Sequence, residues 1–167
     1  MNDFGIIAEF KRRSPSKKDI NTSLSVSKVA KEYEDAGVSG MSVLTDGKYF
    51  SGSLEDLILS RSIISLPLLR KDFVIDEYQI IEAKANGADV ILLIAAILSR
   101  NEIKNFSSLA NNLGLEVLLE VHNLEEIQKS IMPTIDLFGV NNRNLKTFEV
   151  SLETSRSLAE KLSLIHI

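Results

Sequence analysis

The sequence contains no cysteine and only two histidines among its 167 residues. Without cysteine, the chain can form neither a disulfide framework nor a thiolate metal site, and this composition fits the reducing cytoplasm. His122 and His166 are too far apart in the sequence to indicate a histidine metal site. We interpret the first as a loop residue after a strand and the second as a tail residue, and we expect no bound metal.

The chain also lacks a long apolar run and a basic stripe. Its longest apolar run, residues 90–98, is far shorter than the ~20 residues that a membrane-spanning helix needs, and no signal peptide precedes Ile6. The net charge of −4 argues against a nucleic acid as the main partner. A local positive cluster at residues 11–18 indicates either a solvated loop or an anion site beside Glu9. We therefore expect neither a membrane nor a nucleic acid as partner.

Hydrophobic residues, 44% of the chain, occur in short runs that alternate with amphipathic segments. Short runs of consecutive apolar residues are typical of parallel strands that are covered on both faces. The predicted strands span residues 6–10, 41–44, 67–71, 90–94, 116–120 and 137–140. The predicted helices span residues 26–36, 54–63, 77–86, 100–113, 124–130 and 152–162.

Capping residues support these helix boundaries. Four helices are preceded by a residue that stands three positions before an acid or amide, the spacing of a capping box: Ser53, Asp76, Ser99 and Asn123. Three helical patterns are followed by a glycine, as in helix termination: Gly37, Gly87 and Gly114. Strict alternation of strands and helices predicts a parallel sheet with helical crossovers, and therefore an α/β protein.

Two architectures fit this order of elements: a doubly wound open sheet and a (β/α)8 barrel. The open sheet would lead us to expect a glycine-rich turn after the first strand, but residues 11–18, KRRSPSKK, contain no glycine. Functional side chains at the ends of several strands favour the barrel. A complete barrel takes roughly 250 residues, and about six βα units fit here. We therefore predict a single domain over residues 1–167 that is an incomplete TIM barrel.

Polar side chains end four of the predicted strands. In the first, Glu9 and Lys11 flank Phe10, and alternation along an extended chain aims the acid and the base to the same side. The ends of three other strands carry Lys71, Glu120, Asn141 and Arg143. In a parallel sheet these ends meet at one rim, where barrels build their active sites.

Any one of these residues alone could equally belong to a surface loop or an internal ion pair. As a set, they carry a large desolvation cost in a barrel mouth unless they face one another or a ligand, so we predict a shared, ligand-sized cavity. An enclosed lysine beside other cations suits a general acid, and a carboxylate opposite suits a general base. Lys11, Ser14 and Arg143 suit phosphate or carboxylate groups of a substrate.

In these segments the sequence resembles the indole-3-glycerol phosphate synthase family of tryptophan biosynthesis. The resemblance covers nearly the whole chain. It rests on the blocks IIAEFKRRSPSK, SVLTDGKYFSGSLEDL, LLRKDFVIDEYQIIEAKANGADVILLIAAIL, GLEVLLEVHNLEEI and FGVNNRNLKTFEV. The most specific parts are LRKDF followed by IDEYQI, and NNRNLKTFEV.

The resemblance implies a cytoplasmic (β/α)8-barrel carboxy-lyase, a carbon–carbon lyase that uses no metal or organic cofactor. Such an enzyme closes the ring of 1-(2-carboxyphenylamino)-1-deoxyribulose 5-phosphate and releases carbon dioxide and water to give indole-3-glycerol phosphate. The resemblance implies Lys71 as general acid, Glu120 in dehydration and Glu9 as the group that stabilises charge in the ring intermediate. The residues expected to hold or position the substrate are Lys11, Ser14, Asn141, Arg143 and Phe73. The last of these could equally be a core residue.

The sequence departs from the family pattern in several places. It lacks the family's N-terminal extension and the seventh and eighth βα units, which grip the phosphate, and SPSKK stands in place of SPSKG. Residues 163–167, SLIHI, do not match the seventh strand, and we interpret them as a non-native tail. We therefore expect open barrel edges that promote self-association, and little or no turnover by these residues alone.

Two alternatives stay open. The chain could be another phosphate-binding barrel, such as phosphoribosylanthranilate isomerase, although the lysine of RKDF together with Glu120 argues against it. It could also be a non-catalytic barrel fragment, or an assembly partner that completes its barrel with a second chain. Retention of every matched catalytic residue argues against a long-standing loss of function.

Overall fold

A computed structural model describes residues 4–20, 22–143 and 149–162 of the chain. Its strands are β1 (Ile7–Phe10), β2 (Gly40–Leu44), β3 (Leu68–Lys71), β4 (Val90–Ile94), β5 (Glu116–Val121) and β6 (Leu137–Val140). Its helices are α1 (Val26–Asp35), α2 (Gly47–Phe50), α3 (Leu54–Ile63), α4 (Glu77–Ala85), α5 (Arg100–Asn112), α6 (Leu124–Ser130) and α7 (Leu152–Leu162). Every predicted strand and helix is therefore present, with bounds that differ by at most one residue.

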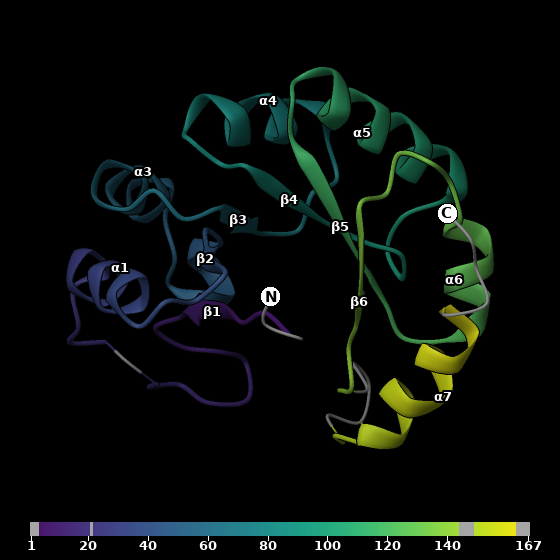
Figure 1. Cartoon of the computed structure of the whole chain (residues 1–167), viewed down its shortest axis with the longest axis horizontal. Coiled ribbons are helices and arrows are strands. Elements are labelled where there is room, and N and C mark those ends of the chain that lie inside the picture. Colours follow the sequence, from purple (N-terminus) through teal and green to yellow (C-terminus); the bar gives the residue numbers. More distant parts are fainter. Residues whose placement is uncertain (1–3, 21, 144–148, 163–167) are drawn as a thin grey trace.

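The strands form one parallel sheet in the order β1-β2-β3-β4-β5-β6. Figure 1 shows that this sheet is curled, with helices α1, α3, α4, α5, α6 and α7 on its convex outer side. Sequential strand order with helices on one face is the arrangement of a (β/α) barrel, whereas a doubly wound sheet carries helices on both faces. The prediction of an incomplete α/β barrel is confirmed. In the described part of the chain, β1 and β6 each pair with a single neighbouring strand.

Capping residues set the helix boundaries as the sequence indicates. The side chains of Ser53, Ser99 and Asn123 each accept a hydrogen bond from the backbone N–H three residues later, and Asp76 accepts from Tyr78. Gly37, Gly87 and Gly114 have positive φ, the conformation that ends a helix most easily at glycine. The one-turn helix α2 is not predicted. It forms because Asp46 accepts hydrogen bonds from the N–H groups of Tyr49 and Phe50.

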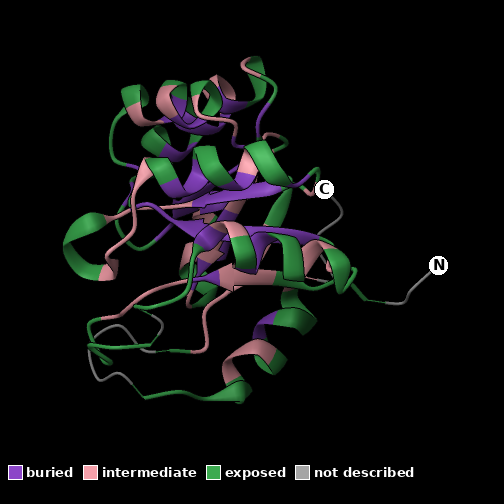
Figure 2. Ribbon diagram, turned by 90° about the vertical axis from the view of Figure 1, so that its left-hand side faces the viewer, coloured by how far each residue is buried: buried purple, intermediate pink, exposed green. Residues whose placement is uncertain are grey.

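Most of the core lies between the sheet and its helices, as the buried strands and helix faces in Figure 2 show. Alternation along β4 separates two apolar clusters, because Ile91 and Leu93 join this outer core while Val90, Leu92 and Ile94 form a smaller cluster on the concave inner face. The outer cluster holds the fold together, and the inner face is left to line a cavity.

The described helices include none that is long and apolar enough to cross a membrane. Residues 163–167, interpreted above as a tail, lie outside the described residues.

Candidate active site

The candidate site lies along the rim where the strands end. Glu9 is in β1, Lys71 ends β3, and Glu120 pairs in register with Ile94, the last residue of β4. Asn141 directly follows β6, and its backbone N–H donates to the Val121 carbonyl at 3.0 Å. Parallel register thus brings side chains from four strands to one end of the inner face.

One half of the site is a cluster of two lysines around Glu9. Lys11 Nζ lies 2.5 Å from Glu9 Oε1, and Lys71 Nζ lies 3.6 Å from Glu9 Oε2. The Glu9 carbonyl also accepts a hydrogen bond from the Tyr33 hydroxyl of α1, which holds the strand end in place. The carboxylate of Glu9 therefore compensates both ammonium groups, and Lys71 is free to extend toward the cavity.

The other half of the site is centred on Glu120. Asn141 Nδ2 donates to Glu120 Oε1 at 3.0 Å, and Asn141 Oδ1 accepts from the Arg143 backbone N–H at 2.9 Å. These two hydrogen bonds fix which end of the Asn141 amide faces the carboxylate. The Glu120 side chain is only 14% exposed, so its charge is held largely out of water.

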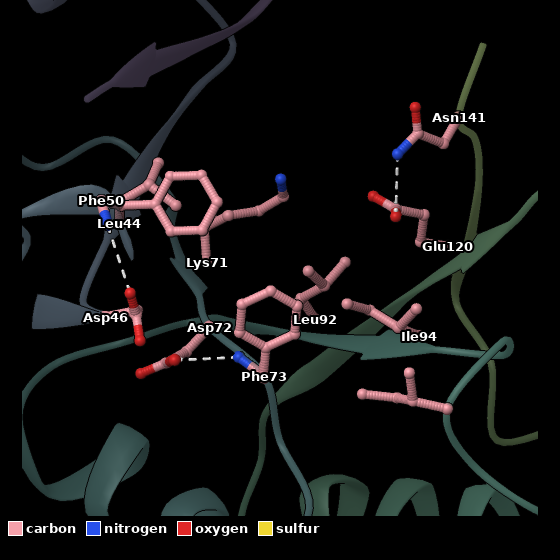
Figure 3. Close-up of a pocket in the computed structure, with 11 residues that line it drawn as sticks. Leu44, Asp46, Phe50, Lys71, Asp72, Phe73, Leu92, Ile94, Glu120 and Asn141 are labelled. Atoms are coloured by element: carbon pink, nitrogen blue, oxygen red, sulfur yellow. Dashed lines mark hydrogen bonds between the residues drawn. The ribbon is translucent and has the colours of Figure 1, made fainter. Parts of the chain in front are cut away.

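A cavity of about 140 Å³ joins the two halves. Figure 3 shows Lys71 extending across this cavity toward Glu120 and Asn141. Its lining combines these three polar residues with apolar side chains and two acids: Leu44, Asp46, Phe50, Asp72, Phe73, Leu92, Ile94 and Ile97. Of the five residues expected to converge, the structure places Lys71, Glu120 and Asn141 on the cavity wall. Glu9 and Lys11 lie outside the lining and are connected to it by the ion pair between Glu9 and Lys71.

Two phenyl rings form an apolar wall of the cavity. The rings of Phe50 and Phe73 lie 6.3 Å apart, at a spacing at which aromatic pairs attract. The backbone of Phe73 is held on both sides, because its N–H donates to Asp72 Oδ1 and its carbonyl accepts from Gln79 Nε2. The wall suits a flat aromatic ligand group. Phe73 is 40% exposed, so it belongs to this wall and not to the core.

Ser14 and Arg143, which we expected to hold anionic groups, lie outside this cavity lining. The Ser14 hydroxyl contacts Ser16 Oγ and accepts from the Lys17 N–H, so it stabilises its own turn. Arg143 Nη1 donates to Ser16 Oγ at 3.3 Å, which joins the loop after β6 to the loop after β1. The structure thus brings these residues to the same end of the barrel, at its outer margin.

The loop after β1 is clamped to its neighbour by two arginines. Arg12 forms a bidentate ion pair with the buried Asp56 and also donates to the Ser51 carbonyl. The hydrogen bond to Asp56 raises the pKa of Arg12 above its ordinary value, against the opposing effect of burial. Arg13 donates to the carbonyls of Gly47 and Lys48. Two members of the positive cluster at residues 11–18, Arg12 and Arg13, therefore make structural contacts.

Sequence reasoning missed three residues of the site. It set His122 aside as a loop residue, yet the ring lies between two carboxylates, 3.6 Å from Glu120 and 3.2 Å from Glu126. Asp46 and Phe50 line the cavity from α2, which was not predicted. The segment DGKYF begins with a helix-capping acid two residues after a strand, and this was the signal that could have found Asp46 and Phe50.

Among the described residues, no group of three or more histidine, cysteine, aspartate or glutamate side chains is arranged to hold a metal ion. The polar groups that gather at this rim are lysine ammonium groups, carboxylates and the Asn141 amide.

Comparison with known proteins shows the family of the chain. A family model for indole-3-glycerol phosphate synthase matches residues 1–166. The chain belongs to the indole-3-glycerol phosphate synthase family. It is 50% identical over 157 residues to an indole-3-glycerol phosphate synthase of Neisseria meningitidis, a match that covers 94% of this chain and 60% of that protein. It is 49% identical over 161 residues to the enzyme of Bacteroides thetaiotaomicron, covering 96% of this chain and 62% of the relative.

A solved structure supports the fold. The chain resembles a truncated form of 3-deoxy-D-arabino-heptulosonate 7-phosphate synthase from Thermotoga maritima, with a TM-score of 0.62 over 95% of this chain and 61% of that chain. At 17% sequence identity this likeness concerns the barrel architecture alone. The chain spans about 60% of the length of these two relatives.

Proposed function

We propose that this chain carries the acid–base machinery of an indole-3-glycerol phosphate synthase. The observation that carries the proposal is the placement of Lys71 and Glu120 on the wall of one cavity. Lys71 is held by an ion pair with Glu9, which lies outside the cavity lining, and Glu120 is held by a hydrogen bond from Asn141, which is part of it. Family membership supports the reaction and its substrate, 1-(2-carboxyphenylamino)-1-deoxyribulose 5-phosphate. Family membership also implies the chemical steps, which we assign to the residues of this chain that match the family pattern.

In the first step, the ammonium of Lys71 donates a proton to the ketone oxygen of the substrate. The ring carbon that bears the carboxylate then attacks the ketone carbon, and the positive charge that develops on the nitrogen-bearing ring is stabilised by Glu9. Loss of carbon dioxide leaves its bonding electrons in the ring and restores aromaticity. A positioned general acid of this kind contributes on the order of 10²–10⁴-fold to rate.

In the second step, the ring intermediate loses water. The hydroxyl formed from the ketone takes a proton from solvent and leaves as water, and Glu120 accepts a proton from the carbon next to nitrogen, which forms the double bond of the indole. Asn141 Nδ2 donates to Glu120 Oε1 and so aims this carboxylate into the cavity. The aromatic wall of Phe50 and Phe73 is suited to the anthranilate ring. No step requires a metal or an organic cofactor, and we place this chemistry in the cytoplasm.

The experiment that tests the proposal is a fusion. Residues 1–162 of this chain are joined to the part of the Neisseria meningitidis relative that follows the matched region, and indole-3-glycerol phosphate is measured by its indole fluorescence. We expect turnover by the fusion, and a loss on the order of 10²–10⁴-fold in the Lys71→Met variant. Arg156→Met, which removes an exposed arginine of α7, is the matched control and is expected to leave turnover unchanged.

A fusion that folds but forms no product, or forms it equally well without Lys71, would refute the proposal. Assaying the same fusion with phosphoribosylanthranilate tests the isomerase alternative, for which we expect no turnover. The chain alone is assayed in parallel, where we expect little product.

The open sheet supports a further part of the proposal, which is self-association of the chain. Edge strand β1 carries Ile7 and edge strand β6 carries Leu137, and these side chains are 48% and 42% exposed. Unpaired edges with apolar side chains favour pairing with another chain. We expect sedimentation velocity to show dimers or larger species that grow with concentration. A single monomeric species with a cooperative thermal transition would contradict this.

A further inference from the structure

His122 follows β5 and continues its inner side. Val117, Leu119 and Val121 belong to the outer core, so the alternating residues Leu118 and Glu120 face inward, and His122 is next in the same series. Its ring lies beside the carboxylate of Glu120, with Nε2 3.6 Å from Oε1. The proposed function assigns this histidine no role.

Glu126 fixes the orientation of the ring. Its Oε2 lies 3.2 Å from His122 Nδ1 and also accepts the backbone N–H of His122 at 2.9 Å. Its Oε1 accepts from Asn123 Nδ2 at 2.8 Å, and its own N–H donates to Asn123 Oδ1, the capping residue of α6. The start of a helix therefore immobilises Glu126, and a carboxylate can only accept, so the proton of the neutral ring belongs on Nδ1.

This arrangement leaves His122 Nε2 in an unusual position. The atom is buried and makes no hydrogen bond to the residues that the structure describes. Its nearest charged neighbour on the other side is Glu120 Oε1, which already accepts from Asn141 Nδ2. Two acceptors that face each other out of water repel, whereas a proton between them satisfies both. The contact of 3.6 Å is one that can shorten when substrate closes the site.

We propose that His122 is a positioning residue for Glu120, held by Glu126 through Nδ1–H and sharing a proton with Glu120 Oε1 through Nε2. This inference rests on the proposed function, in which Glu120 accepts a proton from the reaction intermediate. Oε1 is then occupied by Asn141 and His122. Oε2, which has no hydrogen bond within the described ranges, is the oxygen that faces the substrate. Mobility of the carboxylate is removed before the reaction begins.

The first test is spectroscopic and needs no turnover. Because the chain has only two histidines, ¹⁵N-histidine labelling gives two sets of imidazole signals, which a His166→Gln variant assigns. At neutral pH we expect a protonated Nδ1 in His122, and an Nε2 signal that moves toward the unprotonated position in Glu120→Gln. Glu125→Gln, which removes the same charge from the exposed neighbour of Glu126, is expected to leave both signals in place. An unprotonated Nδ1, or an Nε2 signal that ignores Glu120→Gln, would overturn the inference.

The second test is kinetic and uses two variants of matched size. Gln at position 122 can place an amide N–H where Nε2 stands, whereas Asn can replace only Nδ1. Measured on the fused protein, we expect His122→Asn to lower kcat by about tenfold to a hundredfold with KM changed less than about twofold. His122→Gln should recover most of this loss.

The two proposals fail in different ways. Turnover that is equal in wild type, His122→Asn and His122→Gln overturns the role of His122 and leaves the proposed function standing. Absence of turnover in every protein, with the ¹⁵N signals as expected, overturns the proposed function and leaves the hydrogen-bonded arrangement of His122 supported. A rise in KM with unchanged kcat in His122→Asn contradicts a role in positioning Glu120.

Discussion

Arg70 and Lys71 are neighbours in β3, yet they point to opposite faces of the sheet and do different work. Arg70 is 3% exposed and reaches outward, where it donates to Thr45 Oγ1, the Gln79 carbonyl, Asp72 and Glu82. Lys71 reaches inward to the cavity and has one ionic partner among the described residues, Glu9 at 3.6 Å. One cation is fully occupied by the fold, and the other is kept available for a ligand.

The comparison extends to the whole sheet. On the outer face, the buried guanidinium of Arg70 is satisfied by several partners and apolar side chains are packed under the helices. On the inner rim, charged groups face a cavity and are only partly compensated by one another. Substitutions on the outer face should therefore lower the free energy of unfolding. Substitutions at the inner rim should lower turnover and leave the free energy of unfolding nearly unchanged.

The largest expected effect on stability is that of Arg70→Met. Removal of a buried cation leaves Asp72 and Glu82 without their shared partner, which typically costs about 3–5 kcal/mol. Denaturant unfolding of the two proteins measures the difference. Arg156→Met, which breaks an ion pair that is more than 70% exposed on both sides, should change the free energy of unfolding by less than about 1 kcal/mol. Equal effects of the two substitutions would contradict the contrast between the faces.

A second comparison uses two neighbouring leucines of β4. Leu93 is fully buried in the outer core, and Leu93→Ala is expected to lower the free energy of unfolding by about 2–5 kcal/mol. Leu92 belongs to the inner cluster and borders the cavity, so Leu92→Ala should fall at the ~2 kcal/mol end of that range. If thermal or chemical unfolding shows Leu92→Ala to be the more damaging change, the inner face holds more of the stability than we propose.

A third prediction concerns Lys71. Because its ammonium is only partly compensated, Lys71→Met should change the free energy of unfolding by less than about 1 kcal/mol while abolishing turnover in the fusion. Chemical unfolding and the product assay are run on the same preparation. A variant that loses stability as severely as Arg70→Met would show that Lys71 serves the fold.

The smallest expected effect is a pH dependence at the start of α5, a helix of the outer face. Hydrogen bonds from the Ser99 side chain and backbone lower the pKa of Glu102 below its ordinary value of 4.5. The folded state then binds fewer protons than the unfolded state, so Glu102 adds stability above the ordinary carboxyl pKa, and this is lost as pH falls through the folded value.

Denaturant unfolding curves of wild type and Glu102→Gln, recorded from pH 7 to pH 3, measure this effect. The wild type should have the higher free energy of unfolding at pH 7, and the difference between the two proteins should shrink as the pH falls. Glu55→Gln, at the start of α3, is the control, since Glu55 makes no hydrogen bond to the described residues through its side chain. If the wild type became more stable relative to Glu102→Gln as the pH fell, the pKa of Glu102 would not be lowered in the folded state.

Much of the fold was predictable because its signals are local. Alternating apolar runs, four capping residues and three glycines place the strands and every helix except α2 within one residue of their observed bounds. Parallel order then brings Glu9, Lys71 and Glu120 to one rim, so the main site residues could be predicted together.

What the sequence did not reveal depends on contacts between distant residues or on common short spacings. Alternation predicts that Arg70 and Lys71 diverge, but not that Glu82 and Gln79 of α4 would receive the arginine. Arg143 meets Ser16 from the other end of the chain, and no local pattern shows this. His122 lies two and four residues from its partners, a spacing too ordinary to mark a site.

The most direct test of the account is to map where the proposed substrate binds. A ¹H–¹⁵N spectrum of the full chain is recorded during titration with 1-(2-carboxyphenylamino)-1-deoxyribulose 5-phosphate. We predict shifts at the amides of residues 71–73, 120–122 and 141–143, with residues 39–41 and 116–118 at the opposite end of the inner face unchanged. Shifts confined to that opposite end, or none at millimolar substrate, would contradict a site at the rim.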